Sequence, residues 1–233
     1  MWVKRYTSGA RRWRMWLLNL VVGWLDLPVL KAPPGRSGDA VFQIEQRRLR
    51  QLTGQGVRVP QIVASGRQEL LLSDLGTTLA LRLRKADPDS AQRLFARTVA
   101  ALADAHQRGA YLGQPQARNV VVDEEDRIGF IDFEEDPGEV MSLAQAQCRD
   151  WLLFASGTVR HLPFSDARVS EALAMGLARA DPAVRSALAH NLRRLGWVRA
   201  ISSRLGRRAR GMASAIDALG AALNHADQPL TPE

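Results

Sequence analysis

The stretch HQRGAYLGQPQARNVVVDEEDRIGFIDFEEDP, residues 106–137, carries the pattern that decides the fold. Two apolar runs flank the acidic stretch 123–126 and predict a β-hairpin with that stretch as its turn. Asn119 opens the first run, and Asp132 closes the second. Because a hairpin brings its two ends together, we expect these two side chains to converge beside it.

Helices and strands are expected on both sides of this hairpin. Asp87-Pro88 is a strong helix start, and apolar residues at helical spacing continue that helix to about Gly109. Upstream, the pattern from Ala40 predicts a helix that ends near Gly54. The other expected elements are a short strand that ends at 29–31, a loop over 31–39, strands over 61–64 and 69–72, and hairpin strands over 119–122 and 128–132.

Beyond Ser142 the chain is expected to be helical almost to its end. Expected breaks lie near Leu162-Pro163 and at Gly196, Gly206 and Gly211. A front that bears strands and a helical back predict an α+β protein with two lobes.

Composition narrows the classes of function. The chain has 233 residues, and its hydrophobic fraction of 46% can supply a real core. The single cysteine, Cys148, excludes an internal disulfide framework and a cysteine-based zinc cluster. Ser65 and Ser73 lack the G-x-S-x-G setting of a hydrolase nucleophile, so we exclude a hydrolase.

The net charge of +8 is concentrated in two arginine-rich blocks, at 4–14 and 185–210. Such blocks attract partners that carry phosphate, such as nucleic acid, anionic lipid or a lipid-linked sugar. Nucleic acid is the weakest of these interpretations, because no stacking or recognition-helix signature accompanies the charge. For the second block, an arginine-biased composition explains the charge equally well.

A basic, Trp-rich segment over 1–28 opens the chain, and its apolar run over 15–24 is about half the length of a spanning helix. Three interpretations stay open: an amphipathic anchor lying in a membrane surface, a helix packed on the domain, and a signal or spanning segment.

Residues 106–137 resemble the catalytic and metal-binding loops of the protein-kinase-like fold, especially the branch that includes bacterial lipopolysaccharide core kinases and atypical serine/threonine kinases. The matching residues are His106, Gly109, Gly113, Asn119 and the run Ile131-Asp132-Phe133. The resemblance, which covers about residues 30–154, implies a bilobal kinase-like fold with a reduced N-lobe and hinge over 29–80 and a helical C-lobe over 81–225. Residues 226–233 are expected to form a flexible tail, as chain ends commonly do.

The resemblance also implies ATP and Mg²⁺ as cofactors. Asn119 and Asp132 would hold the metal ions that bridge the phosphates. Lys31 would bind phosphates and pair with Glu45, while the hinge residues Asp74 and Leu75 would receive the adenine. In relatives, the aspartate at the position of Asp150 accepts hydrogen bonds from the loop backbone; a surface pair with Arg149 is the alternative.

Three departures weaken the pattern. Gln114 stands where relatives carry the catalytic aspartate, and an amide cannot take a proton near neutral pH. No glycine-rich loop precedes Lys31. Glu134 replaces the glycine after Asp132-Phe133, so that the acidic run 134–136 would either add a metal ligand or, as we prefer, cap the following helix.

Two functions therefore compete. The first is an ATP-dependent phosphotransferase of low activity, in which Gln114 or Arg118 orients the acceptor and Asp132 takes part in catalysis. The acceptor would be a protein or a lipid-linked sugar at the membrane. The second is a pseudokinase that binds and regulates a protein partner. Both imply a cytoplasmic protein, with a peripheral position on the inner membrane face as the further expectation.

Overall fold

The computed structural model describes residues 1–6, 38–202 and 207–226, and the side chains of 197–202 and 207–210 are not part of that description. In chain order the elements are β1 (Trp2–Arg5), α2 (Asp39–Gly54), β2 (Ile62–Ser65), β3 (Glu69–Leu72), β4 (Thr77–Thr78), α3 (Leu79–Lys85), α4 (Pro88–Gln107), β5 (Val120–Val122), β6 (Ile128–Phe130), η2 (Pro137–Glu139), α5 (Leu143–Thr158), η3 (Val159–His161), α6 (Asp166–Leu177), α7 (Pro182–Ser202) and α8 (Arg207–Ala226).

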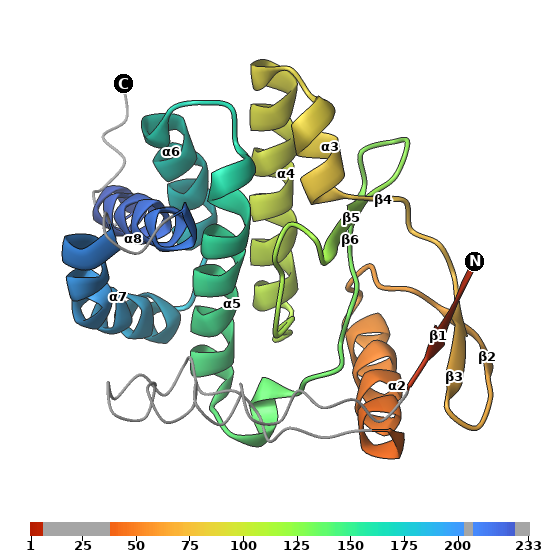
Figure 1. Cartoon of the computed structure of the whole chain (residues 1–233). Coiled ribbons are helices and arrows are strands. Elements are labelled where there is room, and N and C mark those ends of the chain that lie inside the picture. The colour runs from red at the N-terminus through yellow and green to blue at the C-terminus, as the bar shows by residue number, and fades with distance from the viewer. Residues whose placement is uncertain (7–37, 203–206, 227–233) are drawn as a thin grey trace.

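The described residues form a mixed α+β structure, as the sequence predicts. Two small antiparallel sheets have the strand orders β1-β3-β2 and β4-β5-β6. Figure 1 shows β1–β3 and α2 gathered at one side of the molecule and α4–α8 at the other, with β4–β6 beside α3 and α4. A single hydrophobic cluster nevertheless runs from Tyr6 and Phe42 to Leu223, so both sides share one core.

The start of the chain corrects the prediction of a single amphipathic segment over 1–28. Trp2–Arg5 form β1, which pairs with β3 in the register Trp2↔Leu72 to Arg5↔Glu69. Trp2 and Lys4 are half-buried while Val3 and Arg5 are exposed, which is the alternation of a strand with one covered face. The apolar run over 15–24 lies outside the described residues.

Helix α2 confirms the prediction of a helix from 40 to 54 and carries an unusual buried face. Phe42, Leu49 and Leu52 are buried on it, as the helical spacing predicts. Glu45 and Arg48 are buried on the same helix, at 1% and 0% exposure. Buried charges are costly unless they are paired, so the partners of these two residues locate the polar centre of the molecule.

The predicted hairpin is present as β5 and β6, with Val121 opposite Gly129. Asp123 holds its turn, since its carboxylate accepts hydrogen bonds from the main chain and side chain of Arg127 and from Arg58. Burial raises the pKa of Asp123, but these hydrogen bonds and the two arginine charges outweigh burial and lower the pKa to about 2.

Strand β4 adds a third strand to this sheet, and helix α3 follows it directly. Both elements are absent from the sequence prediction. Thr77 and Thr78 pair with β5. The chain reaches them through Gly76, whose φ is 114°, and a Cβ there would lie 2.3 Å from the carbonyl oxygen of Val122. Only glycine accommodates both that dihedral angle and that close approach.

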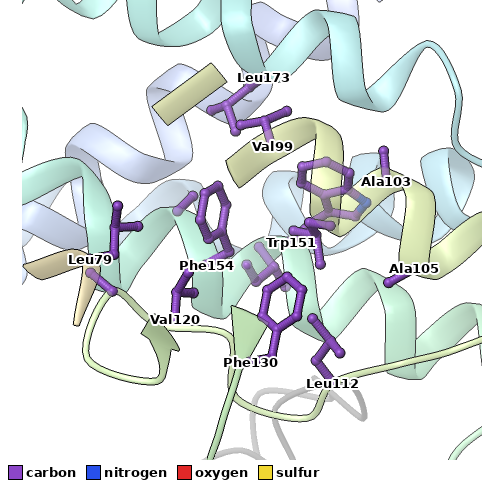
Figure 2. Close-up of a cluster of buried hydrophobic side chains, with 14 of the residues drawn as sticks. Leu79, Val99, Ala103, Ala105, Leu112, Val120, Phe130, Trp151, Phe154 and Leu173 are labelled. Carbon is purple, nitrogen blue, oxygen red and sulfur yellow. The ribbon is translucent and has the colours of Figure 1, made fainter. Parts of the chain in front are cut away.

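The helical side is built around α4 and α5. Asp87 caps α4 by accepting from the backbone N–H groups of Asp89 and Ser90, and Ser142 with Gln145 forms a capping box at the start of α5. Phe154 stacks on Phe95 with ring centroids 5.6 Å apart. Figure 2 shows the core that these helices enclose, which includes Val99, Leu112, Val120, Phe130, Trp151, Phe154 and Leu173.

Two of the predicted helix breaks are wrong. Helix α7 continues through Gly196 and α8 through Gly211, because a glycine inside a helix costs only about 1 kcal/mol relative to alanine and packing of the helix outweighs that cost. The break near Pro163 is confirmed. Gly206 and the strand expected to end at 29–31 lie outside the described residues, and so does 227–233, which holds nearly all of the predicted tail. Among the described helices, none has the length and apolarity needed to cross a bilayer.

Candidate functional site

Three carboxylates, one on α2 and two after β6, meet at the ammonium of Lys4 on β1. Its Nζ lies 2.8 Å from Oε2 of Glu45 on α2, 3.0 Å from Oδ1 of Asp132 and 2.9 Å from Oε1 of Glu134. Asp132 and Glu134 follow β6. The cluster therefore connects β1, α2 and the open end of the hairpin, opposite its turn.

Burial differs sharply within this cluster. The side chain of Glu45 is 1% exposed and that of Lys4 is 16% exposed. The hydroxyl of Tyr6 donates to Oε2 of Glu45 over 2.7 Å, and the backbone N–H of Phe133 donates to Oε1 over 3.4 Å. Burial by itself lowers the pKa of Lys4, but Glu45 and the two other carboxylates outweigh it and raise the pKa above its usual value. Lys4 is therefore a firmly held cation.

The backbone at Asp132 is left-handed, with φ of 72°. Non-glycine residues avoid this region at a cost of about 1–3 kcal/mol, and such residues concentrate at functional sites. The strain is held in place from both sides: Ile131 N–H donates to the carbonyl of Asn119 over 2.9 Å, and Phe133 is buried at 1% exposure. The carboxylate of Asp132 is thereby aimed at Lys4.

Asn119 and Gln114 close the loop that precedes the hairpin. Nδ2 of Asn119 donates to the main-chain carbonyl of Gln114 over 3.0 Å, and Asn119 is buried at 5% exposure. Ile131 N–H donates to the Asn119 carbonyl, so Asn119 pairs with the residue before Asp132; the convergence of the Asn119 and Asp132 side chains stays a prediction.

Asp150 on α5 holds the backbone of the loop before β5 through hydrogen bonds. Its carboxylate accepts from the backbone N–H groups of Leu112 and Gly113 over 2.6 and 2.7 Å, and from Nε2 of His106 over 3.0 Å. Asp150 is completely buried. This confirms that Asp150 supports the loop backbone, and it gives His106 a structural role.

A second polar cluster, missed by the sequence reasoning, holds α2 against the same loop. The guanidinium of Arg48 lies 4.0 Å from the ring centroid of Tyr111 and donates to the Tyr111 carbonyl. The hydroxyl of Tyr111 donates to Asp136 over 2.5 Å, and Arg47 donates to the other oxygen of Asp136 over 2.7 Å. Asp136 also caps η2, as expected for the acidic run 134–136.

The remaining predicted site residues are distributed differently. Glu45 forms its ion pair with Lys4, whereas the sequence predicted a pair with Lys31. Lys31 lies outside the described residues. Lys4 was missed because residues 2–6, WVKRY, show no alternation of apolar and polar residues that would predict a strand. Asp74 is exposed and accepts from Gly76 N–H over 3.0 Å, and Leu75 packs over Gly129. Arg118 is exposed.

The donors present suit a hard cation, but only together with a ligand. Asp132 and Asn119 offer carboxylate and amide oxygens, which Mg²⁺ accepts. Within residues 1–6, 38–202 and 207–226, no group of three or more His, Cys, Asp or Glu side chains is arranged to hold a metal ion without help. Mg²⁺ bound largely by phosphate oxygens fits this donor set. No protein-family model matches the chain, and no match was found among curated proteins.

Proposed function

We propose that this chain has a protein-kinase-like fold and is a divergent phosphotransferase that binds ATP with Mg²⁺. The observation that carries the proposal is the position of one lysine ammonium within 3.0 Å of Glu45 and of Asp132. A lysine on a strand, a glutamate on a helix and an aspartate after a hairpin are the three groups that a kinase-like site brings together around nucleotide phosphates.

In this proposal each residue has one task. Lys4, in place of Lys31, binds phosphate oxygens, and Glu45 holds Lys4 in position. Asp132 and the amide oxygen of Asn119 would hold Mg²⁺, which supplies charge neutralisation for the phosphates when it is bound. The segment at Asp74 and Leu75 would receive the adenine edge through its backbone.

Binding of Mg-ATP to the full chain tests the proposal. A ligand that binds only the folded state, at a hundred times its dissociation constant, stabilises that state by about 2.7 kcal/mol, so the melting temperature should rise. Asp132→Asn should abolish the rise. Asp126→Asn is the matched control, because Asp126 is also left-handed, with φ of 57°, but lies in the hairpin turn. No shift in the wild-type protein would refute nucleotide binding.

A second function, that of a pseudokinase, is favoured by Gln114. General-base catalysis contributes about 10²–10⁴-fold, and an amide supplies none of it. The chain would then bind nucleotide and regulate a protein partner without turnover. Gln114→Asp separates the two functions: it should raise phosphotransfer in single-turnover measurements if only the base is missing. An unchanged rate would leave the pseudokinase as the better account.

The acceptor and the location belong to the same proposal. The basic, Trp-rich start of the chain favours a peripheral position on the cytoplasmic face of a membrane, with a lipid-linked sugar or a membrane protein as acceptor. Truncation would remove β1 and Lys4, so the test keeps the full chain. Replacing Trp13, Trp16 and Trp24 by alanine should reduce flotation with anionic liposomes. Equal flotation would remove the membrane part of the proposal.

A further inference from the structure

Three carboxylates crowd the ammonium of Lys4, which donates hydrogen bonds to Glu45 and Asp132 and forms an ion pair with Glu134. An ammonium carries three N–H donors. Here three carboxylates, those of Glu45, Asp132 and Glu134, lie 2.8, 3.0 and 2.9 Å from Nζ. A phosphate oxygen that contacts Lys4 therefore competes with these carboxylates for the ammonium.

The three carboxylates differ in how firmly they are held. Glu45 is 1% exposed and also accepts from Tyr6 and from the backbone of Phe133, so its departure would strand a buried charge. Asp132 is nearly as exposed as Glu134, at 38%, but it accepts a hydrogen bond from Lys4 over 3.0 Å, and its backbone is fixed between β6 and the buried ring of Phe133. Glu134 is 40% exposed, and Lys4 is the one partner that the described residues give it. Glu134 is thus the carboxylate that can exchange.

We infer that Glu134 is an internal competitor of the ligand: a nucleotide phosphate takes its place on Lys4, and Glu134 thereby sets the affinity and the charge requirement of the site. The inference rests on the proposed function, because it assumes that phosphates enter beside Lys4. Three carboxylates around one ammonium leave an excess of two negative charges. Free ATP is repelled by that excess, whereas ATP complexed with a divalent cation brings compensating charge.

Isothermal titration of the full chain with Mg-ATP tests the competition. Half-exposed ion pairs are weak, so losing this one in Glu134→Gln or Glu134→Ala should tighten Mg-ATP binding by about threefold to fivefold. Glu135→Gln is the matched control. It removes the same charge one residue further on, from a carboxylate that pairs with Arg149 over 3.5 Å. Its affinity should stay at the wild-type value.

The outcomes separate the inference from the function on which it rests. If the wild-type protein and both Glu134 variants fail to bind Mg-ATP, the proposed function is lost. If the wild-type protein binds and the Glu134 variants bind equally or more weakly, the function stands and the competition is refuted. If Glu135→Gln tightened Mg-ATP binding by the same factor, the competition would also be refuted. The effect would then come from the lower negative charge of the region and not from the contact of Glu134 with Lys4.

The charge requirement is tested by repeating the titrations with ATP in the presence of a chelator. Wild-type protein should prefer Mg-ATP strongly over metal-free ATP. Glu134→Gln should narrow that preference by about threefold, because one of the two excess negative charges is removed. The same preference in both proteins would show that Glu134 does not set the charge requirement.

Discussion

Replacing Lys4 by methionine should destabilise the protein more than any other change to the Lys4–Glu45 pair. The side chain keeps its length, but Glu45, 1% exposed, loses its counter-ion. At the N–O distance of 2.8 Å the gross attraction is about 6 kcal/mol for an effective dielectric constant of 20. Desolvation of both groups offsets part of that attraction, and removing one partner of a buried pair costs about 3–5 kcal/mol.

The reverse change, Glu45→Gln, should cost less, about 1–2 kcal/mol, because it leaves an unpaired group that is easier to satisfy. Lys4 would still contact Asp132 and Glu134, both of which are partly exposed. The double variant removes both buried charges together. Its loss should therefore be smaller than the sum of the single losses by about 1–3 kcal/mol.

Urea unfolding of the full chain without nucleotide measures these values, with Lys85→Met as the control on an exposed lysine. Lys4→Met should lower the free energy of unfolding by about 3–5 kcal/mol, which corresponds to about 10 °C in melting temperature, whereas the control should stay within about 0.5 kcal/mol of the wild-type protein. A loss below about 1 kcal/mol for Lys4→Met, or strictly additive losses in the double variant, would refute the idea that this pair is coupled and buried.

Three further changes test the scaffold of the site. Asp150→Ala should cost about 3–5 kcal/mol in urea unfolding, because it leaves two backbone N–H groups and a histidine buried without an acceptor; a loss like that of a surface residue would contradict this role. Asp123→Asn should flatten the fall in melting temperature between pH 4 and pH 2: the lowered pKa of Asp123, about 2, gives stability above its unfolded pKa of 3.8 that is lost as the pH falls through 2. Gly76→Ala should destabilise by more than about 2 kcal/mol, whereas Gly220→Ala, where a Cβ meets nothing within 4 Å, should stabilise α8 by up to about 1 kcal/mol; melting temperatures of opposite sign are the expected result.

Local patterns in the sequence are sufficient for much of the fold. The start of α4 at Asp87 and Pro88 follows from side-chain capping, which acts over three residues. The hairpin follows from two apolar runs around an acidic turn. Both signals act within one element or between adjacent elements, so they can be recognised in the sequence without knowledge of the tertiary structure. Helices α7 and α8 pass through Gly196 and Gly211 because tertiary packing overrides a local preference of about 1 kcal/mol.

The centre of the candidate site could be predicted only in part. The resemblance to kinase-like loops points to Asp132, Asn119 and Glu45, but it points to Lys31 rather than to Lys4. Lys4 meets Asp132 across 128 positions in sequence, through an edge strand of four residues that pairs with β3. No pattern in so short a strand specifies its partner. Likewise, the burial of Arg48 becomes visible only when α2 is packed against Tyr111.

The two polar clusters together specify where α2 lies. Glu45 is held by Lys4 and by the backbone of Phe133, beyond the hairpin, while Arg48 is held by Tyr111, before it. A rotation or shift of α2 would leave both charges buried and unpaired, at a cost of several kcal/mol. Its apolar residues alone would tolerate such a shift. The position of Glu45 beside Asp132 is therefore formed before any ligand arrives. If the proposed function holds, a nucleotide has no helix to move, and we expect it to displace the contact between Lys4 and Glu134.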